Sequence, residues 1–87
     1  MLQAMNKAMI LEHLTLTERH IAEGHQRIER QLQIIRELQN DGRDLATAMS
    51  LLTQFEELLL LHIKDRDRAR AELASRYPAL SSAGSAP

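Results

Sequence analysis

A single internal break divides this chain into two long segments. Glycine and proline are sparse, with three glycines and two prolines in 87 residues. The only cluster of turn-forming residues around a glycine is Asn40-Asp41-Gly42-Arg43-Asp44. Gly42 can adopt the left-handed conformation that ends a helix, and Asp44 can accept backbone amides as the N-cap of the next helix. The sequence therefore predicts a helical hairpin with its turn at residues 40–44.

Both segments carry an apolar stripe that repeats every seven residues. Before the turn, one row holds Leu14, Ile21, Ile28 and Ile35, and the companion row holds Ile10, Thr17, Gly24, Gln31 and Leu38. After the turn, one row holds Leu45, Leu52, Leu59, Arg66 and Leu73, and its neighbour holds Ala48, Phe55, His62 and Ala69. Such repeats are typical of helices that pack along their whole length. The predicted fold class is all-α, a coiled-coil-like antiparallel hairpin of two helices.

The ends of the two helices can also be placed. Thr15 to Glu18 matches a capping box, which would start the first helix there. The apolar pattern nevertheless continues upstream, so residues 1–14 are predicted to be a helical extension, continuous with the first helix and reaching past the end of the second. The hairpin is assigned to 15–77, with its second helix running from Asp44 to about Arg76. Pro78 disfavours helix at the residue before it, and the polar, small residues of 78–87 predict a disordered tail.

The second helix is apolar well beyond the stripe that faces the first. Leu51 and Leu58 extend the stripe on one side, Met49 and Ile63 on the other, and Leu60 and Leu61 almost close the circle. One partner helix cannot cover this surface, so two hairpins are expected to form a homodimeric antiparallel four-helix bundle. The expected hairpin and dimer core consists of Leu14, Ile21, Gly24, Ile28, Ile35, Leu38, Leu45, Leu52, Phe55, Leu58, Leu59, Ile63 and Leu73.

Folding the chain at Gly42 predicts which residues face each other. Gly24 is placed opposite Leu59, and Ile35 near Met49. A glycine inside a helix costs about 1 kcal/mol relative to alanine, so its position in the stripe suggests that the helices cross closely there.

The four histidines invite a search for a metal site. None of the glutamates has a histidine three residues later, so the sequence lacks the motif of ferritin-like di-metal bundles. His25 and His62 are placed about one turn apart on opposite helices, and are the candidate pair for binding a metal or titrating near neutral pH. The alternative is that they are hydrogen-bonded helical histidines with no ligand. No cofactor is expected.

A basic surface for nucleic acid is the second candidate site. Arg27, Arg30, Arg36, Lys64 and Arg68 are the residues that would form it. The formal net charge of −1 and the single Phe and Tyr count against this interpretation, because bases need cations and aromatic rings to bind. Most of the alternating run from Lys64 to Arg70 is expected to pair within itself. Arg66 is expected to reach across to Thr17 and Glu18.

Several classes of protein are disfavoured. The chain has no cysteine, so disulfides and thiol chemistry are absent. No apolar run approaches the roughly 20 residues that span a bilayer, which predicts a cytoplasmic protein without a membrane span. No catalytic set of Ser, His and Asp or phosphate-binding glycine loop is present, so an enzyme is not expected.

Three motifs of this chain resemble a known group of proteins. They are ERHIAEG at 18–24, DGRD at 41–44 and LLTQFEELLLLH at 51–62. The stretch from Glu18 to Arg68 is similar to short helical-hairpin proteins of soil-dwelling and plant-associated alphaproteobacteria. The resemblance implies a bacterial, cytoplasmic hairpin and implies no activity. His20 and His62 match the pattern of that group, whereas His25 falls where the group more often has a charged residue.

The leading hypothesis is a non-enzymatic interaction module that self-associates and presents its surface to a protein partner that the sequence does not identify. The alternatives are a small nucleic-acid-binding regulator and a histidine-based metal or pH sensor.

Overall fold

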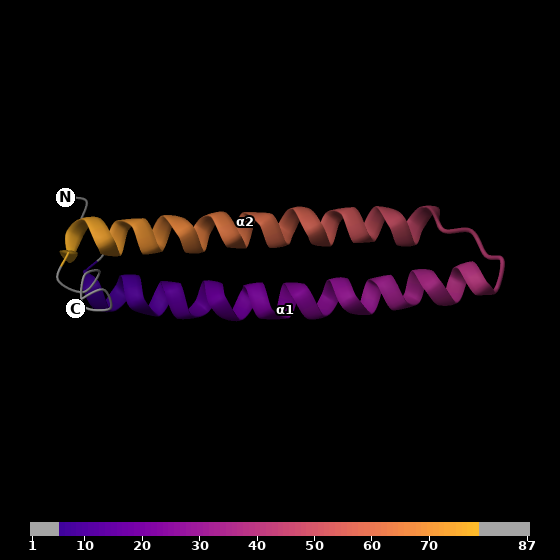
Figure 1. Ribbon diagram of the computed structural model, residues 1–87, viewed down its shortest axis with the longest axis horizontal. Helices are drawn as coiled ribbons and strands as arrows, with labels where there is room; N and C mark the ends of the chain where they lie inside the picture. Colours follow the sequence, from indigo (N-terminus) through magenta and orange to yellow (C-terminus); the bar gives the residue numbers. More distant parts are fainter. Residues whose placement is uncertain (1–5, 79–87) are drawn as a thin grey trace, which may run out of the picture.

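The computed structural model describes residues 6–78 and contains two helices over that range. α1 spans Lys7–Asn40 and α2 spans Ala46–Arg76. The helices lie side by side and antiparallel, so that the start of α1 is next to the end of α2 (Figure 1). The predicted all-α hairpin is confirmed, and the pairing of two hairpins stays a prediction. Residues 1–5 of the predicted extension and 79–87 of the predicted tail lie outside the described residues.

α1 begins at Lys7 and continues without interruption through the capping-box sequence. The Asn6 side chain caps it by accepting a hydrogen bond from the Met9 amide at 2.9 Å. The Thr15 hydroxyl donates to the carbonyl of Leu11 at 3.1 Å, as a residue inside a helix does. Thr15 therefore does not start a helix.

The first turns of α1 are covered by α2. Ile10 is 1% exposed, and it lines a crevice together with Ala69 and Glu72 of α2. The expectation that this segment reaches past the end of α2 is therefore wrong for residues 7–14. Antiparallel counting from the Gly24–Leu59 contact sets residue 7 of α1 level with residue 76 at the end of α2, so α2 reaches the start of α1 (Figure 1). The sequence-based estimate did not apply this count to the ends of the helices.

The turn ends α1 by a Schellman motif. Gly42 has a φ of 67°, the left-handed conformation that glycine adopts at little cost. The Arg43 amide donates to the Leu38 carbonyl at 2.9 Å, and the Gly42 amide donates to the Gln39 carbonyl at 3.1 Å. These two bonds satisfy carbonyls that the end of a helix leaves free. The position predicted for the turn is correct.

α2 begins two residues later than predicted. Its N-cap residue is Leu45, which contributes no capping side chain. Asp44, predicted to be the N-cap, instead accepts the Ala46 amide on its Oδ1 at 3.0 Å. The aspartate still satisfies an amide that the first turn of a helix leaves free, from one position further upstream.

No helix within residues 6–78 is long and apolar enough to cross a membrane.

The two helices are held together by a narrow buried seam. In α1 the more deeply buried row is the companion row, which includes Thr17 at 1% exposure and Gln31 at 6%. Ile35 packs with Ala48 and Leu52 near the turn, and the half-buried Ile28, Leu38 and Leu45 surround them. Of the predicted core, Ile21, Gly24, Ile35, Leu52 and Leu59 are buried, Leu14, Ile28, Leu38, Leu45, Phe55, Ile63 and Leu73 are half-buried, and Leu58 is exposed. Met49, predicted to lie near Ile35, is exposed, and the buried neighbours of Ile35 are Ala48 and Leu52.

Two polar residues in the seam make their hydrogen bonds within the hairpin. The Gln31 side-chain amide donates to the Ala48 carbonyl of α2 at 2.9 Å. The Thr17 hydroxyl donates to the Leu14 carbonyl of its own helix at 2.8 Å. Because a buried polar group is costly when unpaired, the Gln31 bond favours the register that brings these two residues together.

Gly24 marks the close crossing predicted from the sequence. A Cβ atom placed on Gly24 would lie 3.1 Å from Cδ1 of Leu59, which is buried on the facing helix. That separation is shorter than ordinary van der Waals contact, and the glycine therefore lets the two backbones approach.

We expect Gly24→Leu to destabilise the hairpin by about 1–3 kcal/mol, because the added side chain overpacks the seam. Gly24→Ala should stay within about 1 kcal/mol of the parent, since the gain in helix propensity offsets a small displacement of Leu59. Chemical unfolding followed by circular dichroism, at one fixed chain concentration, measures both changes. A Gly24→Leu variant as stable as the parent would contradict the close crossing.

Candidate functional site

Three cross-helix contacts lie along one face of the hairpin. His13, His20 and Arg27 are seven residues apart on α1, and each meets a residue of α2. Residues seven apart lie on the same side of a helix, so Ile34 continues this row. The name histidine face is used below for His13, Leu16, His20, Glu23, Arg27 and Ile34 of α1 with Leu51, Phe55, Leu58, His62 and Asp65 of α2.

The first contact is a hydrogen bond between the helices. His13 Nε2 lies 2.9 Å from Asp65 Oδ2, and each side chain is 36% exposed. A pair this open to solvent contributes at most about 1 kcal/mol to stability. The aspartate was predicted to pair within its own charge run, and the structure places it against α1 instead.

The second contact joins two imidazole rings. The ring centroids of His20 and His62 are 4.8 Å apart, and the ring planes are inclined by 39°. Nδ1 of His62 is buried and has no hydrogen-bond partner in the hairpin. The half-buried His62 thus makes a ring contact at the cost of one unsatisfied polar atom.

The candidate pair of His25 and His62 does not form. His25 is exposed, and the ring that meets His62 is that of His20. The helical spacing explains the difference, because His20 lies in the same heptad row as His13 and Arg27, whereas His25 is five residues further along α1. Within residues 6–78 no group of three or more His, Asp or Glu side chains could hold a metal ion.

The third contact places a cation over an aromatic ring. The Arg27 guanidinium carbon lies 5.6 Å from the centroid of Phe55. This distance is within the range of cation–π attraction, worth about 0.5–1 kcal/mol at an exposed site. Arg27 is therefore held over the hairpin, on the histidine face.

The opposite face of the hairpin is built differently. Glu18 Oε2 lies 3.3 Å from Arg70 Nη2, with both side chains about half exposed. Residues seven apart continue this row along α1 to His25 and Leu32. The name opposite face is used below for Leu11, Glu18, His25 and Leu32 of α1 with Met49, Leu60 and Arg70 of α2.

The expected cross-helix role of Arg66 is wrong. Its guanidinium bonds to Asp67 at 3.1 Å, the neighbouring residue of its own helix. Arg70 takes the predicted partner, Glu18. The charge run from Lys64 to Arg70 therefore pairs partly within itself and partly across the hairpin. The alternation of positive and negative residues did not show which of them pair within α2 and which pair with α1.

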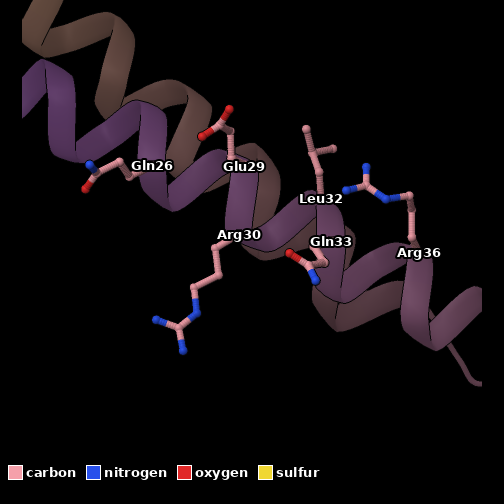
Figure 2. Close-up of a pocket in the computed structure, with 6 residues that line it drawn as sticks. All are labelled: Gln26, Glu29, Arg30, Leu32, Gln33 and Arg36. Atoms are coloured by element: carbon pink, nitrogen blue, oxygen red, sulfur yellow. The ribbon is translucent and has the colours of Figure 1, made fainter.

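The candidate nucleic-acid residues are not gathered into one basic surface. A shallow hollow on the outer side of α1 is lined by Gln26, Glu29, Arg30, Leu32, Gln33 and Arg36. Figure 2 shows that all six come from α1 and that Arg30 points to the opposite side of the helix from Glu29 and Leu32. Glu29 places an acidic group among them. Lys64 and Arg68 belong to the second helix and are exposed there.

Exposed apolar side chains are the dominant feature of the surface. On α2, Met49, Leu51, Leu58, Leu60 and Leu61 are between 38% and 61% exposed. On α1, the same holds for Met9, Leu11, Leu16, Leu32 and Ile34, between 38% and 50%. They occupy both faces of the hairpin and the outer side of α2, so neither helix covers them.

Comparison of the chain with protein-family models, curated proteins and solved structures found no match. The resemblance to alphaproteobacterial hairpin proteins accordingly stays a prediction.

We expect His62→Leu to stabilise the hairpin by about 1 kcal/mol, because it removes the unsatisfied buried Nδ1 and keeps an apolar contact with α1. His25→Leu is the matched control, since His25 is exposed and its replacement should change the free energy of unfolding little. Denaturant titrations at equal chain concentration compare the two. A destabilised His62→Leu variant would show that the ring contact with His20 outweighs the cost of the unpaired nitrogen.

Proposed function

We propose that this chain is a non-enzymatic interaction module that acts as a homodimer of helical hairpins. Two copies form an antiparallel four-helix bundle, and the charged outer sides of the bundle are then presented to a protein partner. The resemblance to bacterial hairpin proteins supports a cytoplasmic location.

The observation that carries this proposal is the apolar surface that the hairpin leaves uncovered. Leu51 and Leu58 of α2 are 38% and 40% exposed, and Leu16 of α1 is 42% exposed. Single exposed leucines are common in proteins, but rows of them along two packed helices are typical of an interaction surface. A second hairpin is the simplest structure that covers such rows on both helices at once.

The small core of one hairpin supports the same proposal. The buried seam includes two alanines, Ala48 and Ala69, and two polar residues, Thr17 and Gln31. Small side chains bury little apolar area, and each buried CH₂ contributes only about 0.8 kcal/mol. A chain of this length has difficulty compensating the entropy of ordering two long helices from one seam. Additional burial between two copies supplies the missing stabilisation.

We expect sedimentation equilibrium to give twice the chain mass at micromolar concentration. The melting temperature should rise with chain concentration, because mass action stabilises a folded dimer. A folded species of one chain mass, with a melting temperature independent of concentration, would refute the proposed dimer. Circular dichroism on the same samples separates that outcome from unfolding, since a folded monomer keeps its helical signal.

A further inference from the structure

We infer that the second copy packs on the histidine face, in antiparallel orientation, with the two-fold axis passing beside Leu58. This inference rests on the proposed homodimer and specifies its interface. The two copies are related so that α1 lies on α1 of the second copy and α2 on α2, with their turns at opposite ends.

The register of the hairpin fixes which residues share a level. Gly24 faces Leu59. Because the helices are antiparallel, one step forward on α1 corresponds to one step back on α2, so Leu58 lies level with position 25 of α1. A two-fold axis at this level pairs each α1 residue of one copy with an α1 residue of the other copy. The two residues lie equally far from position 25, one before it and one after it.

Two exposed apolar residues of α1 are symmetric about this level. Leu16 and Ile34 both belong to the histidine face and lie nine positions on either side of position 25. They are 42% and 38% exposed in the single hairpin. In the antiparallel dimer Leu16 of each copy packs on Ile34 of the other, and this contact occurs twice.

The charges nearest the axis are complementary under the same symmetry. Glu23 and Arg27 are exposed and lie two positions on either side of position 25. Neither side chain has an ion pair in the described part of the hairpin, and Arg27 is held on this face by Phe55. Glu23 of each copy then meets Arg27 of the other. Further out, His13 is set opposite Glu37 of the second copy.

On α2 the axis brings together the two copies of the exposed apolar residue that lies nearest to it. Leu58, 40% exposed, packs on Leu58 of the second copy. The least favourable contact is that of Leu51 with Asp65 of the second copy. The cost of this contact is limited because His13 already bonds the Asp65 carboxylate.

The opposite face has no such common axis. On α1 its exposed apolar residues, Leu11 and Leu32, are centred between positions 21 and 22. On α2 the corresponding pair, Met49 and Leu60, is centred between 54 and 55, level with positions 28 and 29 of α1. The two centres are therefore about 10 Å apart along the hairpin. One axis cannot match both pairs, and Glu18 is already paired with Arg70 on this face.

A parallel arrangement of two copies on the histidine face is less favourable. It would place α1 of one copy on α2 of the other at the same level. Leu16 would then lie at the level of the charge run, next to Asp65 and Arg68 of the second copy. The antiparallel arrangement sets Leu16 against Ile34 instead, which is an apolar contact.

The size of the face suits a stable dimer. α1 has 34 residues, which gives a length of about 50 Å at 1.5 Å per residue. Two packed helices are roughly 18–20 Å wide, so the face measures on the order of 900 Å² per copy, against about 800 Å² in a standard interface.

Disulfide trapping tests the axis directly, because the chain has no cysteine of its own. Leu58→Cys places a thiol beside the axis, and we expect mild oxidation to link most of the dimer through position 58. Leu60→Cys, on the opposite face, is the matched control and should link poorly. Both leucines are exposed in the hairpin, so neither substitution disturbs its seam. Efficient linking at 60 and not at 58 would overturn the inference in favour of the opposite face.

Charge exchange tests the pairing. Glu23→Arg should raise the dimer dissociation constant about tenfold, because it sets like charges together twice at the interface, and Arg27→Glu should do the same. An equimolar mixture of the two variants should form a heterodimer about as tight as the parent dimer. No ion pair joins residues 23 and 27 within the described parent hairpin, and mixing the two variants cannot create one within either chain, so recovery reports contacts between chains. Glu29→Arg, which points away from Arg30 on α1, is the control with little expected effect (Figure 2).

The outcomes separate the two proposals. A protein that is monomeric at every concentration contradicts the proposed function and this inference together. If each single variant dimerises as tightly as the parent, the histidine-face interface alone is contradicted. The same holds if the mixture has a dissociation constant no lower than those of the single variants. Native mass spectrometry of the mixture distinguishes heterodimer from homodimers, because the variants differ in mass.

Discussion

The close approach of the two helices at Gly24 is the constraint on which the rest of the hairpin depends. With no side chain at this position, Leu59 fills the space between the backbones, and the residues above and below are brought into contact range. The resulting seam is narrow, because small and polar residues recur every seven positions along α1. A narrow seam holds two helices together but leaves their flanks uncovered. The narrow seam thus explains both how the two helices are held together and why apolar side chains on their flanks stay exposed.

Heptad periodicity was enough to predict the two helices, the turn and the contact between Gly24 and Leu59. Each of these follows from local rules: a seven-residue apolar repeat, a glycine that can adopt positive φ, and antiparallel counting from the turn. The depth of burial was less predictable. Thr17 and Gln31 were recognised as members of the stripe but were left out of the expected core because they are polar. Their hydrogen bonds to the Leu14 and Ala48 carbonyls explain how they can be buried.

The pairing of surface side chains could be predicted only in part. His62 was correctly placed toward the first helix, but its neighbour is His20 and not His25, a difference of five residues that reverses which side of α1 is involved. The same ambiguity affected Arg66 and Arg70, of which the second reaches Glu18. Long side chains can reach over a turn or more, so counting from the turn alone does not select the partner. The heptad spacing of His13, His20 and Arg27 was the sequence signal that could have done so.

The Schellman turn has a consequence for the way the chain folds. Nearly every contact between α1 and α2 can form by closing the hairpin progressively from Gly42, because each new contact enlarges the enclosed loop by only a few residues and costs little additional entropy. The cluster of Ile35, Ala48 and Leu52 lies closest to the turn and encloses the shortest loop. The hydrogen bond between His13 and Asp65, separated by 52 positions, forms late in such a process. Stability then decreases along the hairpin away from the turn. The end at the turn is the last to open, and the end where α1 begins and α2 ends exchanges its amide protons first.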